Sequence, residues 1–486
     1  MSLERYRGVI PEALMAESLE VSEQLRRRFH GRVLWNVNST AAGGGVAEML
    51  HQLVGYGRGA GLDSRWLVIS GDEKFFRITK RIHNALHGTD GDGSNLGDAE
   101  RRHFERVTAD NFNQMRKRVG ARDVFILHDP QTAALVPLLA ERGHAVIWRC
   151  HIGTEYINDN SRIGWRFLEP YITRARAGVF SRADYVPEYF PVHGVRIIPP
   201  NIDPFSPKNH EMAPDVVRAI LTHCRFLRGG EQYGGAASPG ASTGASTGNS
   251  ADRAARTFTR TDGSQGRVDR AASFVRDGAA PDIGTPLVTQ VSRWDRLKDP
   301  VGVMTGFEYF VTEGQHDNGC HLVLAGPDCT SVSDDPEGRE VFDSVVEAWR
   351  RIDDRVRSRV HIASIPMDDM EENAAIVNAL QRHSAVVVQK SLQEGFGLTV
   401  TEAMWKGRPV LASAVGGIRD QIVNRESGVL LSDPSSSAEF GAALGWLFED
   451  ADRSARIGES AREQVRQNFL GLSSLVSWGD LLDEFA

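Results

Sequence analysis

The chain has 486 residues, of which 41% are hydrophobic and 25% are charged, and its formal net charge at pH 7 is −8. This composition is typical of a folded globular protein, and the negative charge argues against a protein that binds nucleic acid non-specifically. The length suits two large α/β domains or about three smaller ones.

The cysteines, histidines and N-terminal residues bear on redox state, metal binding and location. The four cysteines lack the spacing of a disulfide framework, and none of the 15 histidines joins a cysteine at metal-ligand spacing. We therefore expect free thiols and no essential metal or other cofactor. Residues 1–30 lack the apolar core of a signal peptide, and no run reaches the roughly 18 apolar residues of a membrane span. We expect a cytoplasmic protein without a membrane segment.

The chain begins with an amphipathic pattern over residues 11–29, which predicts a helix, followed by a predicted strand over 33–37. Three glycines, Gly43-Gly44-Gly45, then precede a predicted helix over 46–56. Consecutive glycines let a ligand approach the backbone and expose N–H donors to it. A flexible turn is the alternative, but the position after the first strand favours a ligand loop.

Polar residues follow two later predicted strands. The strand over 124–127 is followed by His128, and the strand over 145–148 is followed by His151. Ligands of open parallel sheets bind at the carboxyl ends of the strands, so we expect at least one of these histidines in a cleft. A single histidine is otherwise often a hydrogen-bonded core residue. Helices are predicted over 111–119 and 133–142, a further strand over 66–69, and a last strand begins near residue 195.

Composition divides the chain into domains. Prolines near residue 200 form a stiff exit from a first domain over 1–205. Residues 206–284 are predicted to be a linker with a low-complexity insertion, because the part from 229 to 280 is rich in Gly, Ser, Ala and Thr and repeats GAST. We expect this insertion to be disordered. A second α/β domain is predicted over 285–471, and the helix over 472–486 is expected to pack back on the first domain.

Basic residues follow the first strand of the predicted second domain. Arg293 and Lys298 lie just beyond the strand over 287–292, at a carboxyl end. An arginine offers a planar two-pronged donor and a lysine a mobile point charge, a combination that suits a phosphate group. Solvated surface charge is the alternative, and the strand-end position favours phosphate binding.

Two glutamates mark a βαβ unit later in this domain. Glu394 lies in the loop after a strand over 385–388, and Glu402 lies on a helix predicted over 398–406. Gly397 lets backbone N–H groups at the helix N-terminus approach an anion, and the glutamates are placed to accept hydrogen bonds from sugar hydroxyls. A capping carboxylate and a solvated helix face are the alternative. A glycosidase pair is disfavoured, because its two carboxyls must flank one bond.

Residues 394–410, EGFGLTVTEAMWKGRPV, resemble the paired-glutamate motif of the retaining glycosyltransferases of family 4. The resemblance implies the GT-B fold, with two Rossmann-like α/β domains facing across a cleft. It also implies a nucleotide-sugar donor in the second domain. The resemblance implies that Gly44 and Gly45 contact the donor phosphate and the acceptor, and that His151 contacts the donor sugar. It implies that Arg293 and Lys298 neutralise the leaving diphosphate and that Glu394 accepts hydroxyls of the donor sugar. It also implies that Leu398 and Thr399 offer backbone donors to phosphate and that Glu402 binds the ribose.

Closer similarity is to the trehalose glycosyltransferring synthases, in the segments NSTAAGGGVAEMLHQLV, VIWRCHIG and QKSLQEGFGLTVTEAMWKGRPV. This similarity implies a reversible, retaining synthesis of trehalose from an NDP-glucose and glucose. The chain departs from the family at CHIGT, where the family often has CHID, and this difference bears on the acceptor. A trehalose phosphorylase, a family 4 glucosyltransferase with another acceptor, and a non-catalytic nucleotide-sugar binding protein remain alternatives.

The expected partners are small molecules, namely NDP-glucose, glucose and trehalose, with no nucleic acid and no membrane. The sequence leaves open a homodimer and the base of the donor nucleotide. Acidic pairs such as Asp334-Asp335 and Asp368-Asp369 lack helper ligands at a strand end, so they are expected in solvated turns and helix N-termini.

Overall fold

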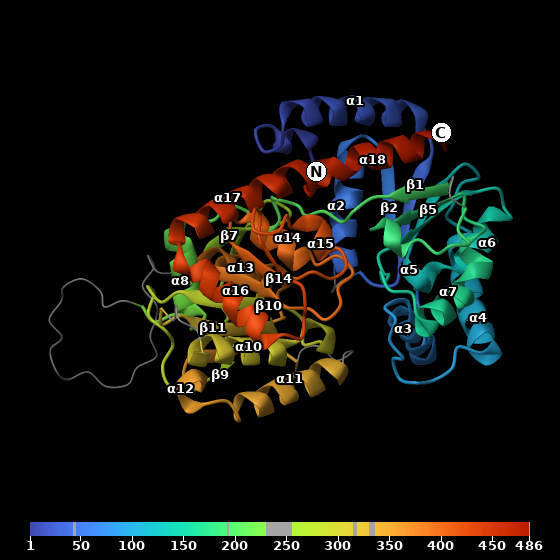
Figure 1. Cartoon of the computed structure of the whole chain (residues 1–486). Helices are drawn as coiled ribbons and strands as arrows, with labels where there is room; N and C mark the ends of the chain where they lie inside the picture. The colour runs from blue at the N-terminus through green and yellow to red at the C-terminus, as the bar shows by residue number, and fades with distance from the viewer. Residues whose placement is uncertain (42–44, 192–193, 230–254, 314–317, 330–335, 486) are drawn as a thin grey trace, which may run out of the picture. The chain divides into compact units, whose positions relative to one another are not determined.

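The structure, a computed structural model, describes residues 1–41, 45–191, 194–229, 255–313, 318–329 and 336–485. The chain divides into two compact units, whose elements are labelled in Figure 1. Unit 1 comprises Met1–Ile202, Gly395–Leu398 and Arg466–Ala486, and unit 2 comprises Asp203–Glu394 and Thr399–Val465. Each unit has its own parallel sheet, which confirms the prediction of two Rossmann-like halves.

Unit 1 contains a six-stranded sheet in the order β2-β1-β3-β4-β5-β6, in which every pair is parallel. Its strands are β1 (Val33–Asn38), β2 (Asp63–Val68), β3 (Val124–His128), β4 (Ala145–Cys150), β5 (Ala177–Phe180) and β6 (Val195–Ile197). Its helices are η1 (Leu3–Tyr6), α1 (Glu12–Arg28), α2 (Gly45–Gly59), α3 (Glu73–Leu86), α4 (Asp98–Met115), α5 (Asp129–Thr132), α6 (Leu135–Ala140), α7 (Asp159–Ile172), η2 (Ala183–Tyr185) and α18 (Gly471–Asp483).

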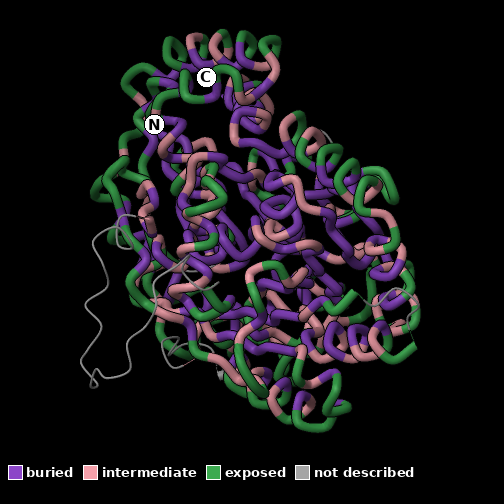
Figure 2. The backbone as a smooth tube through the Cα atoms, turned by 90° about the vertical axis from the view of Figure 1, so that its left-hand side faces the viewer, coloured by how far each residue is buried: buried purple, intermediate pink, exposed green. Residues whose placement is uncertain are grey.

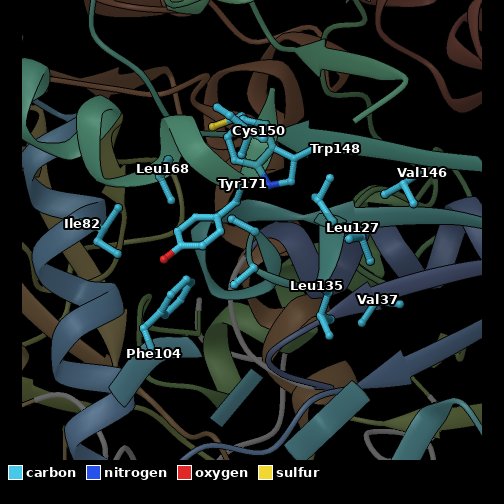
Figure 3. Packing of buried hydrophobic residues seen from close by; sticks show 14 of the residues in the cluster. Val37, Ile82, Phe104, Leu127, Leu135, Val146, Trp148, Cys150, Leu168 and Tyr171 are labelled. Carbon is cyan, nitrogen blue, oxygen red and sulfur yellow. The ribbon is translucent and has the colours of Figure 1, made fainter. Parts of the chain in front are cut away.

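Alternating residues of the central strands face two separate cores of unit 1. Val124 and Ile126 of β3 pack with residues of α1 and α18, whereas Phe125 and Leu127 pack with α3, α4 and α7. A parallel strand covered on both faces needs apolar side chains at consecutive positions, and β3 is buried throughout. Figure 3 shows the second of these cores, in which Trp148 of β4 is fully buried.

Unit 2 contains a seven-stranded sheet in the order β15-β14-β13-β10-β11-β12-β9, parallel except for β9, and a separate hairpin of β7 and β8. Its strands are β7 (Thr257–Thr259), β8 (Gln265–Arg267), β9 (Ser273–Val275), β10 (Leu287–Val291), β11 (His321–Pro327), β12 (Val360–Ile365), β13 (Val386–Gln389), β14 (Val410–Ser413) and β15 (Val429–Leu431). The helices of this part of the chain are α8 (Pro214–His223), η4 (Arg296–Lys298), α10 (Pro300–Glu313), α11 (Pro336–Trp349), α12 (Asp354–Arg357), α13 (Met370–His383), α14 (Leu398–Trp405), α15 (Ile418–Gln421), α16 (Ser437–Glu449) and α17 (Ala451–Asn468).

The strand orders place a topological switch point in each sheet. In unit 2 the chain builds outward from β10 through β11 to β12, then returns to β13 on the other side of β10. In unit 1 it moves from β1 to β2 and then returns to β3. Ligands of doubly wound sheets bind beyond the carboxyl ends of the strands at such points. The fold therefore indicates that the residues after β10 and β13, and those after β1 and β3, are in position to bind ligands.

The surface helices show the burial pattern expected of amphipathic segments, with buried and exposed residues alternating along the tube (Figure 2). Among the described residues no helix is both long enough and apolar enough to cross a membrane. Cys150, Cys224, Cys320 and Cys329 are free thiols, as expected from their spacing.

The predicted linker and insertion over 206–284 needs correction. Residues 230–254, which hold the repeated GAST, lie outside the described residues, but α8, β7, β8 and β9 belong to unit 2. Phe258 and Val268 are buried in one core with residues of α8 and α13. Arg260 pairs with Asp369 at 2.6 Å and with Glu371 at 3.0 Å. The linker was predicted from the average composition of residues 206–284, and this average does not reveal the apolar and charged residues that make these contacts.

Some predicted helix boundaries also differ from the structure. The helix expected over 111–119 is the end of α4, which begins at Asp98. The helix expected over 133–142 is the shorter α6, which begins at Leu135 and ends at Ala140, and the separate helix α5 precedes it. Helix α3 was not predicted, although its apolar residues recur at helical spacing and are buried.

Replacing residues 255–275 by a short Gly/Ser linker should lower the melting temperature, because it removes β9 from the sheet and Arg260 from α13. A loss of about 2 kcal/mol corresponds to roughly 4–8 °C for a domain of this size. The same replacement of residues 230–254 should change melting temperature and turnover little, because their composition predicts a disordered insertion and a doubling of the length of such a segment costs only about 0.6 kcal/mol. Calorimetry of both variants checks the contrast, and equal losses in the two would contradict it.

His321 and His361 lie on neighbouring strands β11 and β12 and share a hydrogen bond of 2.8 Å between Nδ1 and Nε2. Burial, with a smaller effect of Arg359, lowers the pKa of His321 to about 4. Burial, together with His321 and Arg276, lowers the pKa of His361 to about 3. Both imidazoles are therefore neutral at pH 7 in the folded protein.

The free energy of unfolding should fall as the pH is lowered from about 6.5 toward 4. In this window the unfolded histidines take up protons and the folded ones do not, so acid favours the unfolded state. His361, which is 1% exposed, contributes up to about 1.4 kcal/mol per pH unit. Denaturant titrations across the window measure the slope. A variant with both histidines replaced by glutamine should show a shallower slope, and an unchanged slope would contradict the assignment.

Candidate active site

Two of the predicted site residues meet at the switch point of unit 2. Lys298 ends η4, just after β10, and Glu394 lies in the loop after β13. The Lys298 ammonium donates to Oε2 of Glu394, and the side chains are 17% and 10% exposed. The Ser391 hydroxyl donates to the same oxygen at 3.3 Å. A cation and a carboxylate are thus held together at the edge of the sheet where this fold binds ligands.

Arg293 occupies a different position from Lys298. Its side chain is 59% exposed, and its contact with Asp295 is a long one of 3.5 Å. No hydrogen bond or ion pair described in the structure joins Arg293 to Lys298 or Glu394. The structure thus brings together only one of the two predicted basic residues with the glutamate.

Helix α14 begins at Leu398, directly after Gly397, whose φ of 88° favours glycine. The first N–H groups of a helix have no partners within it, so those of Leu398 and Thr399 are the donors that an anion would use. The Thr399 hydroxyl donates to Oε1 of Gln389 at 3.2 Å, which ties the start of the helix to β13.

Glu402, the second glutamate of the motif, is 2% exposed. Its Oε1 lies 3.5 Å from Nζ of Lys208. The Lys406 ammonium donates to the Glu402 carbonyl at 3.1 Å and to Oδ1 of Asn209 at 3.1 Å. Burial, partly opposed by Glu402, lowers the pKa of Lys406 to about 7. Sequence reasoning missed Lys208 and Asn209, because they lie almost 200 positions before the glutamate.

In unit 1, His128 and His151 form one chain of contacts at the carboxyl ends of β3 and β4. His128 Nδ1 lies 3.2 Å from His151 Nε2, and His128 Nε2 lies 3.3 Å from Oδ1 of Asn36. Arg149 Nε donates to His151 Nδ1 at 3.5 Å. With Asn36 Oδ1 as the acceptor at one end and the Arg149 guanidinium as the donor at the other, a proton on Nε2 of each histidine satisfies every contact of the chain. Burial and then Arg149 lower the pKa of both imidazoles, that of His128 to about 3.

Asp129 follows His128 and was not singled out from the sequence. Its backbone is left-handed, with φ of 64°, and its Oδ1 accepts the His151 N–H at 2.8 Å. Burial raises the pKa of Asp129 to about 7, and the His151 N–H and Arg149 oppose this rise. A carboxyl in a strained turn at the end of a strand is common in functional sites. The position of Asp129 directly after the predicted strand was the feature of the sequence that could have identified it.

A cavity of about 70 Å³ lies within unit 1 behind these residues. His128, Arg149 and His151 line one part of it, and apolar side chains of α2 and α18 line most of the rest. Gly44 lies outside the described residues, and Gly45 is the first residue of α2. Among the described residues no group of three His, Cys, Asp or Glu side chains is arranged to hold a metal ion.

Comparison with known proteins agrees with this architecture. The family model "Trehalose synthase, N-terminal domain" matches residues 36–187, and the model "Glycosyl transferases group 1" matches residues 370–464. The chain is 32% identical over 481 residues to a trehalose synthase of Pyrococcus horikoshii, which covers 99% of this chain and 96% of the relative. It is 22% identical to a trehalose phosphorylase of Grifola frondosa, over 98% of this chain and 60% of that protein.

Among solved structures, the chain is similar to an α,α-trehalose-phosphate synthase (UDP-forming) from Burkholderia vietnamiensis. The TM-score is 0.63 at 14% identity, with 93% of this chain and 98% of that chain covered, so the likeness concerns the fold alone. Two Rossmann-like units and the matched group 1 domain define a glycosyltransferase with the GT-B fold. The full-length similarity is more specific, and the chain belongs to the trehalose synthase family.

Proposed function

We propose that the protein transfers a glucosyl group from an NDP-glucose to the anomeric hydroxyl of glucose, with retention, and so forms α,α-trehalose. The observation that carries the proposal is the contact between Lys298 and Glu394 at the switch point of unit 2. A nucleotide sugar needs a cation for its diphosphate and hydrogen-bond acceptors for its hydroxyl groups. This pair supplies both within one contact.

The residues after β10 and β13 and those of α14 have distinct roles in this proposal. Lys298 neutralises charge that develops on the leaving diphosphate, where a fixed cation is most effective. Glu394 accepts hydroxyls of the donor sugar, and the N–H groups of Leu398 and Thr399 bind phosphate. Glu402 holds the ribose, and Arg293 adds a second positive charge when its exposed side chain turns toward the diphosphate.

The residues of unit 1 act on the sugars in the proposal. Gly44 and Gly45 contact the donor phosphate and the acceptor, and His151 contacts the donor sugar. Both ring nitrogens of His151 have protein partners, so its ring is held in one orientation by His128 and Arg149. No side chain is assigned as a nucleophile for double displacement, so the glucosyl group passes from the diphosphate to the acceptor without a covalent enzyme intermediate. The leaving phosphate oxygen takes the proton of the acceptor hydroxyl.

A screen of donors and acceptors tests the proposal. UDP-, ADP- and GDP-glucose are each incubated with glucose, and with other simple sugars as controls, and the products are separated by chromatography. A disaccharide from glucose that does not reduce copper reagents supports the proposal. Turnover only with another acceptor would keep the glycosyltransferase and overturn trehalose synthesis, and binding of the donors without turnover would favour a binding protein.

A trehalose phosphorylase is the second candidate, favoured by the similarity to the Grifola frondosa protein. In that reaction inorganic phosphate takes the place of the nucleotide diphosphate, and the same lysine would bind it. Incubation with trehalose and phosphate distinguishes the two. Glucose 1-phosphate formed without any nucleotide would assign the phosphorylase, whereas a requirement for NDP would assign the synthase.

A further inference from the structure

Lys390 is a buried cation next to the candidate active site that neither the motif nor the proposed mechanism uses. It follows β13 directly, and its side chain is 1% exposed. A buried ammonium is strongly unfavourable unless a carboxylate and further hydrogen bonds compensate for the lost water. Its partner is Asp299, whose Oδ2 accepts from the Lys390 ammonium.

Asp299 is itself the residue after Lys298, and three observations fix its position. Its backbone is left-handed, with φ of 48°, where it ends η4. Its Oδ1 accepts the Gly302 N–H at 3.0 Å at the start of α10, while its Oδ2 holds Lys390. A strained backbone of this kind persists only where the surroundings hold it. The Lys390 ion pair is part of that support.

The same two segments are joined at several further points. The Leu392 N–H donates to the Leu297 carbonyl at 2.8 Å, and Lys298 and Glu394 form the ion pair described above. The Gln290 side chain of β10 donates to the Lys298 carbonyl at 2.7 Å. The turn that carries Lys298 and the loop that carries Glu394 are thus joined by several contacts, of which the ion pair between the buried Lys390 and Asp299 is one.

We infer that Lys390 is a positioning residue, whose ion pair with Asp299 holds the Lys298 ammonium and the Glu394 carboxylate in the relative placement that a nucleotide-sugar diphosphate requires. The inference rests on the proposed function, because it takes a nucleotide sugar as the ligand. Misplacement of a reacting group by about 1 Å can lower the rate by about 100-fold, so such a support has a measurable effect.

The space around the pair supports this inference. A β-carbon added at Gly302 would overlap the Asp299 carboxylate and the Lys390 ammonium. Glycine at this helical position therefore leaves room for the ion pair, although glycine in a helix is less favourable than alanine. A Gly302→Ala substitution is a second way to disturb the pair without removing either charge.

The test is a double-mutant cycle between Lys390→Met and Lys298→Ala. Lys390→Met should lower kcat/KM for the donor by about 10- to 100-fold in the otherwise unchanged protein. In the Lys298→Ala background the same change should cost less than about two-fold, because Lys390 acts through Lys298. Equal losses in both backgrounds would show a merely structural role and overturn the inference.

Two further variants guard against simple misfolding. Asp299→Asn keeps the size of the side chain and its bond to Gly302, and it should reproduce the loss in kcat/KM with native circular dichroism. Gly302→Ala should lower kcat/KM in the same direction. Arg296→Ala is the matched control, because Arg296 lies in the same turn, its side chain is 71% exposed, and it forms a surface ion pair with Glu340 at 3.4 Å. Its turnover should be unchanged, and a loss as large as that of Asp299→Asn would overturn the inference.

Binding of UDP, ADP and GDP, measured by calorimetry on the same variants, separates this inference from the proposed function. If the wild-type protein makes trehalose but the cycle is additive, the function stands and the inference is wrong. If the wild-type protein binds an NDP without making trehalose, the same coupling in Kd still supports Lys390 as a positioning residue. If it neither turns over nor binds any of the three, both are overturned.

Discussion

Replacing Lys298 by alanine should lower kcat by about 100-fold or more. The ammonium stabilises charge on the leaving diphosphate, and loss of one such preorganised group typically costs about 100- to 1,000-fold. The substitution also removes an ammonium group from contact with the Glu394 carboxylate, which is 10% exposed. Steady-state kinetics at saturating donor measures the effect.

Lys298→Arg should recover only part of this loss, because a planar guanidinium does not reproduce the position of an ammonium on a flexible chain. Arg293→Ala should also lower kcat by about 100-fold if its exposed side chain reaches the diphosphate. Near-normal turnover of Lys298→Ala would remove the lysine from the mechanism, and the same result for Arg293→Ala would remove the arginine alone.

Replacing Glu394 by glutamine should lower kcat/KM for the donor by about 100-fold. The amide keeps the shape of the side chain but accepts fewer hydrogen bonds from sugar hydroxyls, and it leaves Lys298 without its carboxylate partner. The position of the Lys298 ammonium is then less well fixed, so the lysine also positions the diphosphate less well. Initial rates over a range of donor concentrations measure the effect.

Two controls accompany this variant. Glu340→Gln removes an exposed carboxylate of the same unit, 69% exposed, and should leave the kinetics unchanged. Ser391→Ala removes one long hydrogen bond of 3.3 Å, from an uncharged donor, to the Glu394 carboxylate and should cost only about five-fold, which corresponds to about 1 kcal/mol. A Glu394→Gln enzyme with the kinetics of Ser391→Ala would show that the negative charge of Glu394 is dispensable.

The sequence allowed the fold to be predicted because its signals are local. Strands such as β3 and β13 are short apolar runs, and the polar residues that follow them mark the edge where ligands bind in a parallel sheet. The same rule predicted separate strand-end positions for Lys298 and Glu394, and the structure brings the two into contact because β10 and β13 are neighbours at the switch point. The similarity at residues 394–410 then identified the class of protein.

What could not be predicted depends on contacts between distant residues. Lys208 near Glu402, and Lys390 with Asp299, are pairs whose members lie about 90 to 190 positions apart. The ordered hairpin near Phe258 follows a segment of very different composition, so an average over the whole segment concealed it. The raised pKa of Asp129 arises from burial, which a pattern of residues does not reveal.

The central claim is the reaction, and the anomeric protons of the product test it most directly. An NDP-glucose and glucose are incubated with the enzyme in EDTA, and the product is examined by proton NMR. We expect one anomeric signal from a symmetrical α,α-linked disaccharide without reducing-end signals, and the reverse reaction from trehalose and NDP should release the donor. A disaccharide with reducing-end signals, or a β-anomeric linkage, would contradict the claim.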